Sequence, residues 1–275
     1  MSSLAVIIPN YNKEAYLKKC IDSIMQQTVL PDEIIIVDDV STDSSREIIL
    51  LLAKGNSRIK PVFLEKNGGV SNARNTGVAY AKTDYITFLD SDDFYYNPDK
   101  LKNEMQILSG KGDMALAYSK TVKVNEKGEL INTGLANWRY LSGKVDAALI
   151  ANYKGFSTLP RDYTMAKSAF LQSGGYDLSR ALYEDFELSM KLACLGITFW
   201  YTGESGTGYR AVSGGLSDKK KKILAKEFRD LRFKYWKKYP SLKGKMQILI
   251  LGITQLVRRV YEFVIRRIGL EVDIK

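Results

Sequence analysis

Short apolar runs alternate with segments of helical periodicity along the first hundred residues. The runs occupy residues 4–8, 33–37, 61–64 and 85–89, and polar or turn-forming residues bound each of them, as is typical of buried strands. Between them, helical spacing covers residues 16–25, 71–81, and a segment from the capping residues 41–43 to about 54. Four strands that alternate with helices predict a parallel sheet with right-handed crossovers, in which ligands bind at the carboxyl ends of the strands.

The pattern of the second half is mixed. Its predicted elements are a helix at 98–108, strands at 114–118, 121–124 and 130–132, a helix at 167–172 ending at Gly174-Gly175, a helix at 184–195 ending at Gly196, and a strand at 197–201. The tetrad Asn125-Glu126-Lys127-Gly128 favours a hairpin. From residue 218 onward the pattern predicts helix only. We therefore expect an α/β protein with a mostly parallel sheet flanked by helices, a mixed second half and a C-terminal helical extension.

Composition limits the class of protein. The chain has 275 residues, 45% of them apolar and 26% charged, which suits one large domain with an appendage. Cys20 and Cys194 both lie in apolar helical patterns, which argues against a disulfide framework or a cysteine metal site and favours a reducing compartment. The amino terminus lacks the basic residues of a signal peptide, and the run at 4–8 is too short for one. We expect a cytoplasmic protein.

Histidine is absent from the chain. This excludes an imidazole base, a Ser-His or Cys-His pair, and histidine as a metal ligand. Any catalytic base must therefore be a carboxylate, lysine, tyrosine or cysteine.

An acidic cluster follows the apolar run at 85–89. Asp90, Ser91 and Asp92 come first, and Asp93 follows at once. Carboxylates this close repel one another, so their place at the carboxyl end of a strand predicts a divalent cation, Mn²⁺ or Mg²⁺, that shares an anionic ligand such as a diphosphate. The alternative is a solvated acidic turn in which Asp92 or Asp93 caps the next helix.

Five motifs occur in a recognisable order. They are Val6-Ile7-Ile8-Pro9-Asn10-Tyr11-Asn12, Val37-Asp38-Asp39-Val40-Ser41-Thr42-Asp43, Asn67-Gly68-Gly69-Val70-Ser71-Asn72-Ala73-Arg74-Asn75, Phe88-Leu89-Asp90-Ser91-Asp92-Asp93, and Gly174-Gly175-Tyr176-Asp177 leading to Glu184-Asp185. Together they resemble the family-2 inverting glycosyltransferases of GT-A fold over residues 3–215. The resemblance implies a glycosyltransferase domain at 1–215, with a nucleotide-binding half at 1–110 and an acceptor-side half at 111–215. A basic helical extension at 216–275 would follow it.

The resemblance assigns several residues to the nucleotide. Pro9 and Tyr11 would bind the base, and Asp39 would accept a hydrogen bond from a uracil N3–H, while Asp38 is structural. Arg74 would lie near the nucleotide, facing the same edge. The alternatives are that Tyr11 packs, that the aspartates cap a helix, and that Arg74 is a solvated surface residue.

The resemblance also assigns the chemistry. Asp90 would belong to the ribose site or the metal shell, Ser91 to the nucleotide site, and Asp92 to the metal that bridges the diphosphate. Of the pair Glu184 and Asp185, Asp185 would be the general base that deprotonates the acceptor hydroxyl, so that the anomeric configuration inverts. The alternative for this pair is complementation of a helix dipole at the start of a helix.

Two positions depart from the family pattern. Val40 stands where glycine is common, and Val212 stands where a histidine is often found two residues after Arg210. Without that histidine, a cation would be held by Asp92, waters and phosphates alone, or the region from Arg210 to residue 217 would bind phosphate by another route.

Positive charge is concentrated at the C-terminus. Residues 216–275 hold 17 Lys/Arg and 6 Asp/Glu, a net charge of +11, which leaves −1 for residues 1–215. Polar and charged residues interrupt the apolar stretch at 246–268, so it is not a membrane span. As a helix, its polar face would carry Gln255, Arg258, Arg259, Glu262 and Arg266, and its apolar face Ile253, Leu256, Val257, Val260, Tyr261, Val264 and Ile268.

An amphipathic basic helix suits an anionic bilayer surface. Residues 219–268 are therefore predicted to bind the inner face of the membrane peripherally. The alternative stays open that their apolar face packs on the body of the protein or on a second subunit, as a homodimer through the C-terminal helices.

These features lead to one functional hypothesis. The protein would transfer a sugar from a nucleotide sugar, UDP-linked in our prediction, to a hydroxyl of a glycan or lipid-linked glycan. One alternative is a sugar-nucleotide pyrophosphorylase, although the Pro9-Asn10-Tyr11-Asn12 loop is unlike the Gly-rich, Arg-containing loop usual there. Another is a non-enzymatic protein that binds polyanions through its tail. No specific nucleic acid partner is expected.

Overall fold

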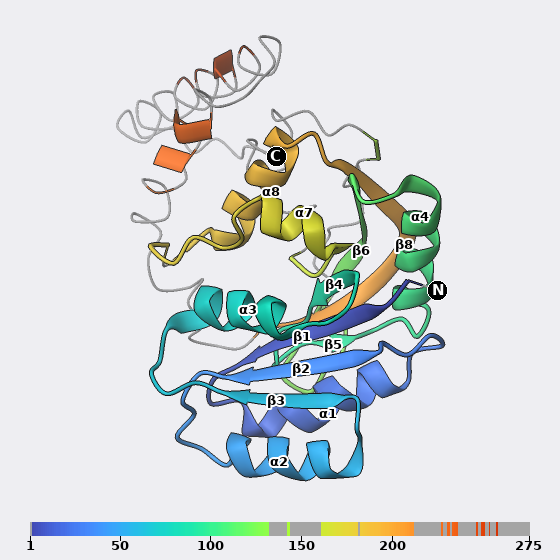
Figure 1. Ribbon diagram of the computed structural model, residues 1–275, viewed down its shortest axis with the longest axis vertical. Helices are drawn as coiled ribbons and strands as arrows, with labels where there is room; N and C mark the ends of the chain where they lie inside the picture. The colour runs from blue at the N-terminus through green and yellow to red at the C-terminus, as the bar shows by residue number, and fades with distance from the viewer. Residues whose placement is uncertain are drawn as a thin grey trace, which may run out of the picture.

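The computed structural model describes residues 2–131, 142–143, 161–180 and 182–211, together with isolated positions between 227 and 257. Within these residues an eight-stranded sheet runs in the order β3-β2-β1-β4-β7-β6-β8-β5 (Figure 1). Helices flank the sheet, and its second half is mixed in strand direction. The expected α/β class is confirmed.

The first half alternates strands and helices as the apolar pattern predicts. Its elements are β1 (Leu4–Asn10), α1 (Glu14–Met25), β2 (Glu33–Asp38), α2 (Ser45–Gly55), β3 (Ile59–Phe63), α3 (Gly69–Tyr80) and β4 (Tyr85–Phe88). β1 pairs in parallel with β2 and β4, and β2 pairs in parallel with β3. These four strands form the predicted parallel sheet.

Some boundaries differ from the prediction because tertiary hydrogen bonds set them. β1 continues through Pro9 to Asn10, whose carbonyl accepts the Asp39 N–H at 2.9 Å. α2 begins at Ser45 rather than at 41–43, because the Asp43 carboxylate accepts N–H groups from both Ser45 and Glu14 at 3.0 Å. Asp43 thus joins the starts of two helices instead of beginning one.

Helices cover both faces of β1 and β2, which explains their uninterrupted apolar runs. Right-handed crossovers place α1 and α2 on one face and α3, which returns the chain to β4, on the other (Figure 1). α3 lies very close to the sheet, since a Cβ on Gly77 would come within 2.4 Å of Ile7 Cγ2 and 3.3 Å of Val37 Cγ2. This contact holds the C-terminal part of α3 against β1 and β2.

The second half contains both strand directions. Its elements are β5 (Phe94–Tyr95), α4 (Lys100–Lys111), β6 (Ala115–Val124), β7 (Thr164–Ala166), α7 (Lys167–Gln172), α8 (Glu184–Cys194) and β8 (Thr198–Arg210). β7 is antiparallel to β4 and β6, whereas β8 is parallel to β6 and antiparallel to β5.

The strand prediction for this half was partly wrong. The two strands expected at 114–118 and 121–124 are one strand, β6, which pairs with β8 through register shifts after Tyr118 and Lys120. β8 continues to Arg210 rather than ending at 201, and β5 and β7 were not predicted. The expected hairpin is present, with the Ile131 N–H donating to the Lys123 carbonyl at 3.0 Å, although residue 132 lies outside the described residues.

The C-terminal extension is helical at its described positions. Leu231 and Tyr235 are buried in the main core, and the Tyr235 hydroxyl donates to the Glu187 carboxylate on α8 at 2.9 Å. Lys234 pairs with the same carboxylate at 2.6 Å. The first part of the extension therefore packs on the body of the protein, as one of the two alternatives proposed.

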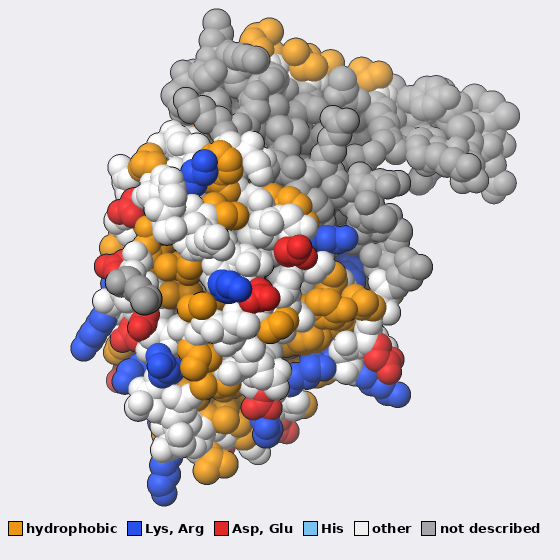
Figure 2. Space-filling view, turned by 90° about the vertical axis from the view of Figure 1, so that its right-hand side faces the viewer, with side chains coloured by type: hydrophobic (Ala, Val, Ile, Leu, Met, Phe, Trp, Pro, Cys, Tyr) orange, Lys and Arg blue, Asp and Glu red, His pale blue; other side chains and the backbone are white. Residues whose placement is uncertain are grey.

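Farther along, a row of apolar side chains is exposed. Hydrophobic side chains line the outer edge of the extension in Figure 2. They are each between 43% and 62% exposed and belong to Met246, Leu249, Ile250, Ile253 and Val257. Among the described residues, no helix is both long and apolar enough to cross a membrane. The rest of the predicted amphipathic helix lies outside the described residues.

Candidate functional site

The predicted site residues lie along the carboxyl edge of β1, β2 and β4. Asn10 and Asp38 end β1 and β2 as direct partners in the sheet. The Asp38 carboxylate accepts hydrogen bonds from Asn10 Nδ2 at 2.8 Å and Ser41 Oγ at 2.6 Å. Asp38 is buried and binds its neighbours, which agrees with the structural role predicted for it.

Asp39 shapes the turn before α3. Its two carboxylate oxygens accept the N–H groups of Gly68 and Gly69, each at 2.8 Å. Gly69 has φ +81°, a conformation that favours glycine. Tyr11 is 48% exposed, whereas Pro9 is buried within β1. The roles of these three residues in base recognition stay predictions.

The third and fifth motifs meet in space. Asn75 on α3 donates from Nδ2 to the Tyr176 carbonyl at 2.9 Å, and its Oδ1 accepts the Tyr176 N–H at 3.0 Å. Gly175 lies close beneath, since a Cβ there would come within 2.8 Å of Asn75 Oδ1. This reciprocal pair holds the loop before α8 against α3.

The acidic cluster is compact. Ligand oxygens of Asp90, Asp92 and Asp93 all lie within 4.8 Å of one another. Each acid has a different partner: Asp90 binds two arginines, Asp92 pairs with Lys13 at 2.7 Å, and Asp93 accepts the Arg210 N–H at 2.8 Å. Burial and the neighbouring Asp90 charge raise the pKa of Asp93 well above its usual value. Ser91 is buried between these acids.

Arg74 connects this cluster to the start of α8. Its guanidinium binds Asp90 Oδ1 at 2.6 Å and Glu184 Oε1 at 3.1 Å, and the side chain is only 1% exposed. The guanidinium carbon also lies 5.2 Å from the centre of the Tyr176 ring. Arg74 is therefore a buried bridge rather than the solvated residue of the alternative interpretation.

Arg161 is a site residue that the sequence did not reveal. Its guanidinium lies 3.0 Å from Asp90 Oδ2 and 5.1 Å from the centre of the Tyr209 ring. Although burial opposes ionisation, Arg74 and Arg161 hold the pKa of Asp90 down at about 2. Arg161 precedes β7, a strand that was not predicted, and no motif marks it.

Asp185 stands next to Glu184 in the first turn of α8, where its Oδ1 accepts the Phe186 N–H at 2.7 Å. Burial and the charge of Glu184 raise the pKa of Asp185 to about 6, despite the opposing effect of Arg161 and Arg74. Arg161 thus acts on both Asp90 and Asp185. A carboxyl whose pKa lies near neutral pH is suited to accept a proton.

A family model described as Glycosyl transferase family 2 matches residues 5–155. The chain belongs to glycosyl transferase family 2. This confirms the resemblance carried by the five motifs.

The family-2 chain has relatives among longer proteins. It is 32% identical over 194 residues to the chondroitin synthase of Pasteurella multocida strain Pm70, covering 70% of this chain and 19% of that protein. It is 30% identical over 227 residues to glycosyltransferase GlyA of Streptococcus pneumoniae serotype 4, covering 78% of this chain and 31% of that protein. The chain thus spans about a fifth to a third of the length of these relatives.

The family-2 fold is also shared with solved structures. The crystal structure of S. aureus TarS 1–349 in complex with UDP-GlcNAc superposes with a TM-score of 0.70 at 20% identity, over 90% of this chain and 70% of that chain. The UDP complex of the same protein gives 0.69 at 19% identity, over 98% of this chain and 76% of that chain. These likenesses confirm the GT-A type of fold.

The carboxylates of the acidic cluster are suited to bind a divalent cation. Carboxylate oxygens are the ligands that Mg²⁺ and Mn²⁺ prefer, and three of them converge here. Both oxygens of Asp90 hold arginines, and Asp93 is buried, so Asp92, with 24% of its side chain exposed, is the most accessible ligand. Asp92 and Asp90 stay predicted metal ligands.

Arg210 fastens the turn that carries these acids. Its Nε donates to the Asp92 carbonyl at 2.8 Å, and its NH1 donates to the Glu126 carbonyl in the hairpin. Two of the three guanidinium nitrogens of Arg210 are therefore engaged with backbone, and phosphate binding by this region stays a prediction. Val212, where the family often has a histidine, lies outside the described residues.

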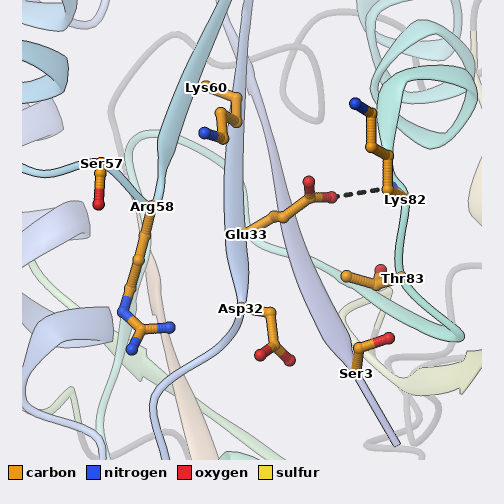
Figure 3. A pocket seen from close by; sticks show the side chains of 8 residues that line it. All are labelled: Ser3, Asp32, Glu33, Ser57, Arg58, Lys60, Lys82 and Thr83. Carbon is orange, nitrogen blue, oxygen red and sulfur yellow. Dashed lines mark hydrogen bonds between the residues drawn. The ribbon is translucent and has the colours of Figure 1, made fainter.

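A polar hollow of about 490 Å³ lies at the opposite end of the glycosyltransferase's parallel strands. Figure 3 shows Asp32, Glu33, Arg58, Lys60 and Lys82 among its lining residues, with Glu33 pointing toward Lys82 and accepting its backbone N–H at 2.8 Å. The hollow is at the amino ends of the strands, away from every motif. We assign it no role in the reaction.

Proposed function

We propose that this glycosyltransferase moves a sugar from a UDP-linked donor to a hydroxyl of a glycan or lipid-linked glycan, with inversion at the anomeric carbon. The observation that carries the proposal is the Arg74 bridge from Asp90 to Glu184, because it ties the acidic cluster to the helix that bears Asp185. Donor-side acids and a carboxyl with a raised pKa are thereby joined in one site.

The reaction is a single displacement. The acceptor oxygen forms a bond to the anomeric carbon while the bond from that carbon to the phosphate oxygen breaks, and UDP departs with the electron pair. Asp185 takes the acceptor proton. A divalent cation at Asp92 would neutralise negative charge on the departing diphosphate. Arg74 and Arg161 hold Asp90 ionised and in place on the donor side.

The choice of UDP has independent support. The structural neighbours include complexes of S. aureus TarS with UDP and with UDP-GlcNAc. Chondroitin synthase and hyaluronan synthase are among the relatives by sequence. In this chain the Tyr11 ring is 48% exposed and open to stacking on a uracil base. Asp39 is buried, and each of its oxygens accepts a glycine N–H but keeps a second lone pair for the uracil N3–H.

Thermal unfolding of the full chain with a panel of nucleotides tests the donor. UDP and UDP-sugars with Mn²⁺ should raise the melting temperature, because a ligand at a hundred times its Kd stabilises the native state by about 2.7 kcal/mol. CDP, GDP and ADP at the same concentration should have smaller effects, since their bases lack the uracil N3–H beside its O2 and O4 acceptors.

Other outcomes would favour the rival functions. Release of pyrophosphate from a nucleoside triphosphate and a sugar phosphate would indicate a pyrophosphorylase. Steeply salt-dependent binding to arbitrary DNA, unaffected by nucleotide sugars, would indicate a polyanion-binding protein. Equal stabilisation by all nucleotides would remove the preference for UDP.

We further propose that the enzyme acts at the cytoplasmic face of the membrane, bound peripherally through its extension. The exposed row from Met246 to Val257 and the net charge of +11 over residues 216–275 support an anionic bilayer as the surface that covers the row.

Replacing Ile250 and Ile253 together by glutamate should abolish sedimentation with vesicles that contain anionic lipid. The wild type should bind these vesicles and bind neutral ones weakly. Leu51→Glu is the matched control, because Leu51 is 72% exposed on α2. Unchanged sedimentation of the double variant would show that the apolar row does not bind the bilayer. A wild-type dimer that the double variant dissociates would show that a second subunit covers the row instead.

A further inference from the structure

Lys13 forms an ion pair with Asp92, the most accessible acid of the cluster. Its ammonium lies 2.7 Å from Asp92 Oδ2, and the two side chains are 32% and 24% exposed. Asp90 is held instead by two arginines, the buried Arg74 and the 32% exposed Arg161, and Asp93 by a backbone N–H. Among the described partners of these three acids, Lys13 has the flexible aliphatic stem that can swing away from its carboxylate.

The backbone of Lys13 is anchored on the nucleotide side. Lys13 directly precedes α1, and the adjoining Asn12 has φ +53°. Asn12 donates its N–H to Ser41 Oγ at 2.9 Å and accepts the Thr42 N–H at 2.7 Å. The main chain is thus fixed beside the turn after β2, while the side chain reaches across to Asp92.

A divalent cation and this ammonium compete for the same carboxylate. Cations such as Mg²⁺ bind carboxylate oxygens at about 2.0–2.1 Å. A Lys13 ammonium on the same Asp92 oxygen would then lie close to a doubly charged ion, and like charges at such a distance repel. Cation binding at Asp92 Oδ2 therefore requires Lys13 to move.

We propose that Lys13 is an exchangeable counter-ion of Asp92, which yields this carboxylate to the divalent cation and then binds the diphosphate of the donor. The inference rests on the proposed function, since the released ammonium needs an anion at the carboxyl edge. Its consequence is cooperativity. Lys13 weakens cation binding when nucleotide is absent and strengthens it when a diphosphate is present to receive the ammonium.

Lys13→Met, which keeps most of the stem and removes the charge, tests this. Titration of Mn²⁺ followed by the electron paramagnetic resonance of the free ion should show about tenfold tighter binding without nucleotide. The factor by which UDP improves Mn²⁺ affinity should fall about tenfold. Because coupling between two ligands is reciprocal, calorimetry should find the same fall in the factor by which Mn²⁺ improves UDP affinity.

Two controls make the comparison specific. Lys18→Met removes a lysine of α1 that is 76% exposed and pairs with Asp22. It should change neither the Mn²⁺ affinity nor the UDP affinity. Asp92→Asn should abolish the Mn²⁺ binding that Lys13→Met tightens, which ties the signal to this carboxylate.

Unchanged or weaker Mn²⁺ binding by Lys13→Met without nucleotide would overturn the proposal. So would an absence of Mn²⁺ binding in every variant that still binds UDP, and that result would leave the sugar-transfer function standing. Failure of the wild type to bind UDP would instead count against the proposed function, and the nucleotide-free Mn²⁺ comparison would still decide whether Lys13 competes for Asp92.

Discussion

Asp185→Asn is expected to lower kcat by about 10²- to 10⁴-fold while leaving UDP affinity nearly unchanged. The amide has the shape of the carboxylate, and its oxygen can still accept the Phe186 N–H that Asp185 accepts at 2.7 Å. It cannot take the acceptor proton. Initial rates and UDP titrations on the wild type and the variant measure the two quantities. Asp113→Asn, which alters an exposed acid bonded to Tyr85, is the matched control and should retain full activity.

The pH dependence of kcat/KM provides a second check on the same role. Burial and Glu184 raise the pKa of Asp185 to about 6, so the carboxyl is protonated below that pH and ionised above it. A base must be ionised to act, and the rate should therefore rise with pH through about 6 and level off. The residual activity of Asp185→Asn should lack this rise. Retention of wild-type turnover, or of the same acidic limb, in the variant would remove Asp185 from the reaction.

Arg74→Met should be the most damaging change for folding among the site residues. Arg74 is 1% exposed and compensates two carboxylates, Asp90 in the turn after β4 and Glu184 at the start of α8. Removing one partner of a buried ion pair leaves uncompensated charge and costs about 3–5 kcal/mol. Urea unfolding should show a loss of this size, and UDP affinity should fall because Asp90 loses one of the two arginines that hold it.

Arg46→Met is a suitable control for that measurement. Arg46 is exposed on α2, and its guanidinium stacks 4.3 Å from the centre of the Phe63 ring. Its loss should cost about 1 kcal/mol or less. Arg74→Lys, which keeps the charge but lacks the planar fork, should fall between the wild type and Arg74→Met. If Arg74→Met unfolds at the same urea concentration as Arg46→Met, the bridge is not what joins the two sides of the site.

The parallel half was predictable because its strands are buried on both faces. Uninterrupted apolar runs such as those of β1 and β2 occur where helices cover a sheet on each side. α8 was likewise predicted, with its start at Glu184 and its end within one residue, because its amphipathic pattern and Gly196 mark it locally. The order of the motifs then placed the candidate acids along one edge.

β8 was hidden because its second part looks like a loop. The stretch Thr202-Gly203-Glu204-Ser205-Gly206 lacks apolar alternation, and pairing with β6 and β5 makes it a strand. Two glycines of β8 are required by tertiary contacts. A Cβ on Gly206 would come within 2.4 Å of Ser119, and a Cβ on Gly208 would come within 2.7 Å of Phe94. Such close approaches have no signature in a single sequence.

The sequence by itself determined the family, the parallel strands and the acids that end them, because burial and turn chemistry act over a few neighbouring residues. Only the tertiary structure decided which charges compensate which. Arg74 reaches Glu184 across 110 positions of the chain. Arg161 reaches Asp90 from a segment with no motif, and Lys13, just after the first motif, reaches Asp92 near the fourth. Ion pairs between distant residues depend on how the folded chain brings their segments together, and the local spacing of residues does not predict this.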